Sequence, residues 1–278
     1  MCTRLHAIGF PCEMNDAAAQ FIIETAENPR HRSQHGAGDY RIWRARTGAE
    51  VWLHYPKKRP LRRGRSLRRD ATGPTADAEF DALGDLMGLS VFHSGSSAVA
   101  MRIVRALASS DSNPLDGVCI ATLASARAGE KKIAFTFELL EFAGHRHHTD
   151  VDATVQITGL AQKAWGFANE QAYLGATPAN RLIGTGAIVG VEPEDVRDVG
   201  LIYRPKPATL WLMTGEVRRA TRLINPITSQ PYYLVSLATD RGTFDIVANS
   251  DVIEGDVSVG HTMQTVACLA GRILKLAT

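Results

Sequence analysis

Residues 212–274 read LMTGEVRRATRLINPITSQPYYLVSLATDRGTFDIVANSDVIEGDVSVGHTMQTVACLAGRIL. The apolar runs in this stretch are short and rich in Val, Ile, Thr and Tyr, and turn residues interrupt them at short intervals, a pattern typical of β-strands. Asn225 and Pro226 begin one turn, because proline fixes its own φ and asparagine hydrogen-bonds to the nearby backbone. Gly242 completes a hairpin turn, since glycine readily adopts a positive φ. Five short strands of this kind predict a small antiparallel β-barrel over residues 208–278.

The N-terminal fifth of the chain predicts the order strand, helix, strand, strand. Residues 5–12 fit a strand, and Asn15 or Asp16 can cap a helix that ends before Pro29. Residues 39–55 fit a hairpin whose turn contains Gly48.

The central part of the chain adds further predicted strands and one helix. Strands are expected at residues 98–107, 115–122, 132–142 and 150–159. Residues 160–176 place apolar side chains at helical spacing and are predicted to form a helix. No internal repeat is evident.

These elements together predict a two-part α+β protein. Residues 1–175 are expected to form the first domain, with a loop insertion at 56–78. Residues 176–207 are expected to be a connector, and residues 208–278 the small barrel.

The overall composition favours a folded, cytoplasmic protein. The chain has 278 residues, of which 45% are hydrophobic, so it can bury a substantial core. The N-terminus lacks the apolar run of a signal peptide, and no stretch approaches the ~20 apolar residues that span a bilayer. The four cysteines are scattered singly, which favours free thiols over a disulfide framework.

The net charge is only +2, but the basic residues are unevenly distributed. Residues 57–69 hold eight basic residues and no acid, and the remainder of the chain carries 23 basic against 29 acidic residues. Such a block is either a solvated loop or a patch that binds phosphates. If the barrel and the basic run bind nucleic acid together, the residues expected to do so are Lys57, Lys58, Arg59, Arg62, Arg63, Arg65, Arg68, Arg69, Arg218, Arg222 and Tyr232.

Two parts of the chain resemble known folds. LHAIGFPCEMNDAAAQFI (residues 5–22), followed by TGAEVWLHY (residues 47–55), resembles one module of the vicinal-oxygen-chelate, or glyoxalase-like, superfamily. In that superfamily a histidine and a glutamate on separate strands bind a divalent metal ion, so the resemblance implies His6 and Glu50 as metal ligands. The C-terminal strand pattern is similar to that of OB-like barrels, which often bind single-stranded nucleic acid.

Three functional hypotheses follow. The leading one is a non-catalytic protein that binds a small molecule or a protein partner, because no complete catalytic set is evident. One alternative is nucleic-acid binding through the basic run and the barrel. The other is a metal-dependent enzyme of the glyoxalase-like type, using His6 and Glu50.

Overall fold

A computed structural model describes residues 2–11, 16–35, 38–57, 85–110, 113–123, 134–176, 183–190 and 210–277. The helices are α1 (Cys2–Ala7), α2 (Asp16–Glu27), α4 (Phe142–His145), α5 (Glu170–Leu174) and the 3-10 helix η2 (Ser250–Val252). The strands are β1 (His31–His35), β2 (Gly38–Arg44), β3 (Ala49–Pro56), β4 (Gly88–His93), β5 (Ala98–Ser110), β6 (Asn113–Leu123), β7 (Ala134–Leu139), β8 (Val151–Phe167), β9 (Ile188–Gly190), β10 (Leu210–Ile224), β11 (Pro231–Thr239), β12 (Gly242–Asn249), β13 (Ile253–Glu254) and β14 (Thr262–Leu276).

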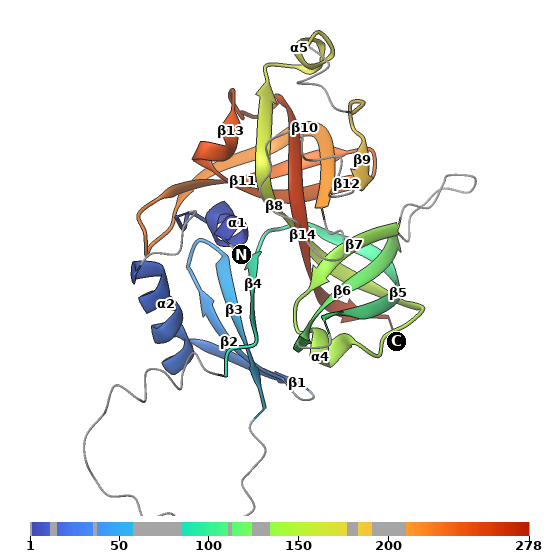
Figure 1. Ribbon diagram of the computed structural model, residues 1–278. Helices are drawn as coiled ribbons and strands as arrows, with labels where there is room; N and C mark the ends of the chain where they lie inside the picture. The colour runs from blue at the N-terminus through green and yellow to red at the C-terminus, as the bar shows by residue number, and fades with distance from the viewer. Residues whose placement is uncertain are drawn as a thin grey trace, which may run out of the picture.

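Strands β1 to β4 form an antiparallel sheet, here called the N-terminal sheet (Figure 1). The predicted hairpin is confirmed, because β2 pairs with β3 and Gly48 in the turn has a φ of 99°. The predicted helix is also confirmed as α2, and the ring centroid of Phe21 lies 5.0 Å from that of Trp43 on β2. The strand predicted at residues 5–12 is wrong, because Leu5 to Ala7 form the second half of α1 and residues 8–11 are not in a strand. Its buried apolar residues are close enough in sequence to share one helical face as well as to alternate along a strand.

Eight of the strands from β5 to β14 form two five-stranded barrels that share two strands (Figure 1). The short strands β9 and β13 pair with β10 and β8 outside these rings. In the first barrel β5, β6 and β7 pair in order, and β8 and β14 close the ring. In the second barrel β10, β11 and β12 pair in order, and the same two strands close the ring. We call the antiparallel β8–β14 pair the shared ribbon. Each barrel therefore takes its fourth strand from its own part of the chain and its fifth from the other part.

The two halves of this double barrel repeat each other. Each half runs as three strands, a short helix and a long strand, namely β5-β6-β7-α4-β8 and β10-β11-β12-η2-β14, and the second half has the additional two-residue strand β13 before β14. The first strand of each half has a register shift, at residues 103–105 and 217–219. In each half the third strand makes a parallel contact with the ribbon, through Thr-Phe-Glu-Leu at residues 136–139 and Thr-Phe-Asp-Ile at residues 243–246. The two halves therefore share a topology, and the similar four-residue sequences on their third strands are a short sequence similarity that accompanies it.

Equivalent buried carboxylates in the two barrels contact the N-terminal elements. Glu138 on β7 forms an ion pair with Arg4 of α1. Asp245 on β12 accepts hydrogen bonds from the backbone N–H groups of Ser96 (2.6 Å) and Ser97 (2.7 Å), which lie between β4 and β5. Both acids are almost fully buried, so each needs such a partner.

The predicted fold class is wrong. The described structure is mostly β, and a glyoxalase-like α+β domain followed by a small antiparallel barrel is not observed. The C-terminal block contributes four long strands, but its ring is closed by β8, whose second half was predicted to be helical. Residues 160–167 are strand because β14 pairs with them along their length and β13 pairs with Ala164 and Trp165, and this pairing overrides a weak helical spacing. Each barrel also contains one parallel contact.

Candidate functional site

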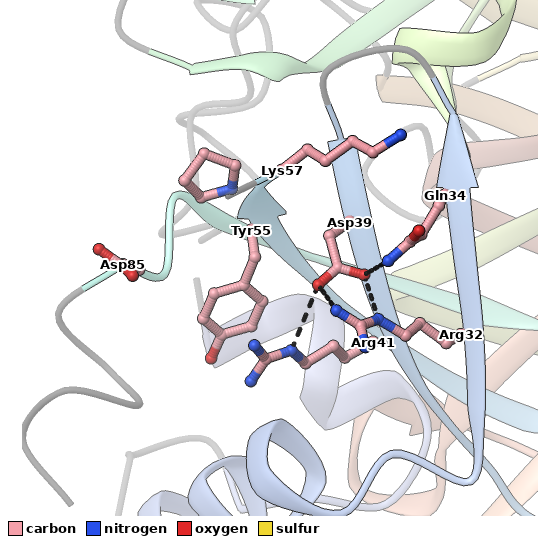
Figure 2. A pocket seen from close by; sticks show the side chains of 8 residues that line it. Arg32, Gln34, Asp39, Arg41, Tyr55, Lys57 and Asp85 are labelled. Atoms are coloured by element: carbon pink, nitrogen blue, oxygen red, sulfur yellow. Dashed lines mark hydrogen bonds and ion pairs between the residues drawn. The ribbon is translucent and has the colours of Figure 1, made fainter. Parts of the chain in front are cut away.

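A cavity of about 240 Å³ lies on the N-terminal sheet, near its edge strand β1 (Figure 2). The side chains that line it come from β1, β2 and β3 and from the segments that follow β3 and precede β4. They are Arg32, Gln34, Asp39, Arg41, Tyr55, Pro56, Lys57 and Asp85.

The strand register brings these side chains onto one face of the sheet. Arg32 lies opposite Arg41, Gln34 lies opposite Asp39, and Asp39 lies opposite Tyr55. Residues two apart on a strand point to the same face, so charged and polar groups that alternate along β1 and β2 gather in one place.

Asp39 organises the polar side of the cavity. It is 4% exposed and accepts hydrogen bonds from Nε and Nη2 of Arg32 at 2.5 Å and from Nε2 of Gln34 at 3.3 Å. The Nε atom of Arg41 lies 3.7 Å from Oδ2 of the same carboxylate. Burial acts to raise the pKa of Asp39, but the hydrogen bonds from Arg32 and Gln34 outweigh it and the pKa is lowered. Asp39 is therefore an anion that holds two guanidinium groups in place.

Tyr55 and a helix carbonyl fix the second guanidinium from other directions. The Cζ atom of Arg41 lies 4.1 Å from the centroid of the Tyr55 ring, and its Nη1 donates to the carbonyl of Ala26 in α2. Burial raises the pKa of Tyr55, so its hydroxyl stays protonated at neutral pH. A stacked, hydrogen-bonded arginine loses little side-chain entropy when it meets a ligand.

The cavity retains unused positive charge. The side chain of Arg32 is 51% exposed although its Nε and Nη2 are engaged. Lys57 has no acidic partner among the residues described by the structure, and in Figure 2 its ammonium group extends across the same cavity. Arginine and lysine in this arrangement recognise carboxylates or phosphates.

The cavity lining is rich in charged and polar groups. Among the described residues it contains two arginines, a lysine, a glutamine and two aspartates. This arrangement is suited to holding an anion.

The two predicted metal ligands have no partner in common. His6 lies on α1, where Nδ1 is 2.8 Å from the carbonyl oxygen of Phe10 and Nε2 is 2.8 Å from Asp251. Glu50 on β3 is fully buried, and its carboxylate pairs with Arg44 and Arg272. Within the described ranges, no group of three or more His, Cys, Asp or Glu side chains could hold a metal ion.

Glu50 belongs instead to an ion-pair network between the N-terminal sheet and the shared ribbon. Its carboxylate lies 2.8 Å from Nε of Arg44 and 3.4 Å from Nη1 of Arg272 on β14, and it accepts hydrogen bonds from Trp52 and Ser94. A metal ion at Glu50 would have to displace these partners.

The residues predicted to bind nucleic acid lie in different environments. Tyr232 is fully buried and donates a 2.9 Å hydrogen bond to Thr47, so its ring is part of the core and cannot stack on a base. Arg218 and Arg222 are exposed on β10, and Arg218 pairs with Glu216 at 2.7 Å. Of the basic run only Lys57 is described, at the cavity. The others lie outside the described residues, namely Lys58, Arg59, Arg62, Arg63, Arg65, Arg68 and Arg69.

The sequence interpretation missed Arg32, Asp39 and Arg41. Residues 31–39 are polar and contain glycines, a composition that predicts a loop, but residues 31–35 form β1. The sequence of β1, HRSQH, is polar at every position. It therefore lacks the apolar face that usually identifies a strand.

Comparisons with known proteins add no family assignment. No protein-family model matches the chain, and no curated protein or solved structure is detectably similar to it. Within the described ranges, none of the helices has the length and apolar character needed to cross a membrane.

Proposed function

We propose that the protein binds a small anionic ligand, without transforming it, in the cavity on the N-terminal sheet. The observation that carries this proposal is the arrangement around Asp39. One buried carboxylate holds Arg32 and Arg41, and Lys57 adds a third cation with no acidic partner in the described chain. Pre-positioned cations reduce the entropy lost on binding.

The size of the cavity supports a small ligand. Its volume is about 240 Å³, and drug-sized ligands occupy pockets of ~300 Å³ and larger. An inorganic oxyanion, a short phosphate ester or a small carboxylate fits this limit. A folded nucleic acid could present only one group to it.

Calorimetric titration with inorganic phosphate at low ionic strength tests the proposal. We expect saturable binding to the wild-type protein. Arg32→Gln and Lys57→Gln should each weaken it roughly tenfold or more, the cost of losing a hydrogen bond to a charged group. Arg102→Gln is the matched control, because Arg102 is an exposed arginine on the first barrel that pairs with Asp152 at 3.3 Å. Absence of binding, or an equal loss in the Arg102 variant, would refute a specific site.

Nucleic-acid binding is a second candidate. The observation that favours it is that Lys57, at the cavity, is also the first of eight basic residues in sequence. Clustered cations displace counterions from phosphates, so the affinity for a single-stranded oligonucleotide should fall steeply with salt. Filter binding over a salt series, with Lys57→Gln, Arg218→Gln and Arg222→Gln, measures this. Affinity that does not respond to salt would exclude this function.

A further inference from the structure

We propose that the group bound in the cavity is a phosphate monoester in its dianionic form, an inference that rests on the proposed anion-binding function. The reason is the balance of charges on the side of the cavity that contains Asp39. Three cations, Arg32, Arg41 and Lys57, face one carboxylate there, which leaves two positive charges. A dianion neutralises them, whereas a carboxylate or a phosphodiester carries only one charge.

The second acid of the lining does not alter this balance locally. Figure 2 shows Asp85 on the other side of Tyr55 from Asp39 and its arginines. An anion is repelled by Asp85 and is therefore directed toward Arg32 and Lys57. The organic part of a monoester would extend toward Tyr55 and Asp85, where a ligand hydroxyl finds an acceptor.

The directions of the donors also favour phosphate. Arg32, Arg41 and Lys57 belong to β1, to β2 and to the segment after β3, so they approach the cavity from three places in the fold. A monoester phosphate presents three acceptor oxygens in a tetrahedral arrangement, and a carboxylate presents two in a plane. Three separate cations match the tetrahedral group better.

The pH dependence of the affinity should follow the ionisation of the ligand and not the ionisation of the protein. The second pKa of a phosphate monoester is about 6. Arginines keep their charge at all relevant pH values. The hydrogen bonds from Arg32 and Gln34 lower the pKa of Asp39, so it stays ionised, and burial raises the pKa of Tyr55, so it stays neutral. The remaining charged groups of the lining are Lys57 and Asp85, and α2 contributes the backbone carbonyl of Ala26.

The test compares methyl phosphate, dimethyl phosphate and acetate by calorimetric titration at pH 5, 6 and 7 and constant ionic strength. The dianionic fraction of a monoester rises about tenfold from pH 5 to pH 7. The affinity for methyl phosphate should therefore rise about tenfold over this range and exceed that for the other two ligands at pH 7. Dimethyl phosphate and acetate should bind weakly and show no such rise.

The results of these titrations distinguish the preference for a dianion from anion binding in general. Equal affinity for methyl and dimethyl phosphate at pH 7 would overturn the preference for a dianion. An affinity for methyl phosphate that does not change with pH would do the same. In either case the proposal that the cavity binds anions would stand. Failure of all three ligands and of inorganic phosphate to bind removes the proposed function itself. Arg32→Lys keeps the charge but loses the guanidinium that Asp39 holds, so it should weaken methyl phosphate binding. Arg102→Gln should leave it unchanged.

Discussion

The carboxylate of Glu50 shows how burial determines the role of a charged residue. It lies between Arg44 and Arg272 with no exposed surface. A buried charge of this kind is stable only while its counter-charges remain. The same carboxylate that could be a metal ligand by its sequence position is therefore a link between β3 and β14.

Replacement of Glu50 by Gln should destabilise the protein strongly. Arg272 is only 19% exposed and would keep its charge with no carboxylate beside it. Breaking a buried ion pair in this way costs about 3–5 kcal/mol. Urea denaturation measures the change in the free energy of unfolding. The matched control is Glu216→Gln, which breaks an exposed pair with Arg218 and should cost less than ~1 kcal/mol. Similar losses in the two variants would contradict a buried-charge role for Glu50.

A second residue, Asp116, should make stability depend on pH. It lies on β6, two residues before Val118, which is opposite Glu138, so both acids are on one face of the sheet. Burial, followed by the charge of Glu138, raises the pKa of Asp116 to about 7, against the opposing effect of Arg4. The two carboxylates thus share one nearby arginine.

The sign of this dependence follows from linkage. The unfolded chain releases the proton near pH 3.9, and the folded protein keeps it until about pH 7. The contribution of Asp116 to the free energy of unfolding is therefore most favourable below ~pH 4 and becomes less favourable as the pH rises toward 7. Asp116→Asn cannot ionise, so at pH 8 it should be more stable than the wild type by on the order of 2 kcal/mol, and about equal at pH 4. Urea denaturation at several pH values tests this, with the exposed Asp152→Asn as control. A constant difference between Asp116→Asn and wild type at all pH values would contradict it.

At the scale of elements, the shared ribbon contains two equivalent glycines whose backbone lies close to side chains of the barrel cores. Gly271 of β14 pairs beside β7, and Gly159 of β8 pairs beside β12. A Cβ atom at Gly271 would lie 2.5 Å from the Phe137 ring, and one at Gly159 would lie 2.6 Å from Ile246. Both contacts are well inside van der Waals distance, so the barrel cores leave no room for a side chain at these positions.

Gly271→Ala should therefore destabilise the protein by about 1–3 kcal/mol, because an overpacked core must shift the Phe137 ring or the backbone. Gly184→Ala is the control, since a Cβ atom there meets nothing within 4 Å. The two variants are compared by thermal unfolding at equal concentration. A change in Gly271→Ala no larger than that in Gly184→Ala would show that the core of the first barrel is more adaptable than its packing indicates.

At the scale of the whole molecule, the shared ribbon makes the two barrels one structural unit. β8 and β14 are antiparallel partners from residues 153–167 and 262–276, and neither ring closes without both strands. One continuous hydrophobic core contains Phe137 of the first barrel and Phe244 of the second.

Unfolding should accordingly be a single cooperative transition. Differential scanning calorimetry should give one peak, with the calorimetric enthalpy equal to the van't Hoff enthalpy. Gly271→Ala, a change in the first barrel, should move the whole peak to lower temperature. Two resolved peaks, with only one shifted by the substitution, would mean that the barrels unfold separately.

Local patterns in the sequence determined several elements. The hairpin of β2 and β3 follows from its turn glycine and flanking alternation, and α2 follows from a capping residue near its start and Pro29 beyond its end. Strands β10 to β12 follow from short β-branched runs between turn residues. Lys57 begins the basic run that the sequence marks as a solvated loop or a phosphate-binding patch, and it lines the cavity. In each case the signal lies within a few neighbouring residues.

Tertiary structure alone decided the fold class, the closure of the barrels and the cavity. Residues 160–167 carry a weak helical spacing, yet they extend β8 because β14 pairs with them along their length, with β12 at Leu160 and β13 at Ala164 and Trp165 on the other side. These partners lie about 90 to 110 residues away in the chain. Arg32 and Arg41 act together only because the β1–β2 register places both beside Asp39. Local propensity can be overruled by long-range backbone pairing, and such pairing cannot be determined from the residues of one segment.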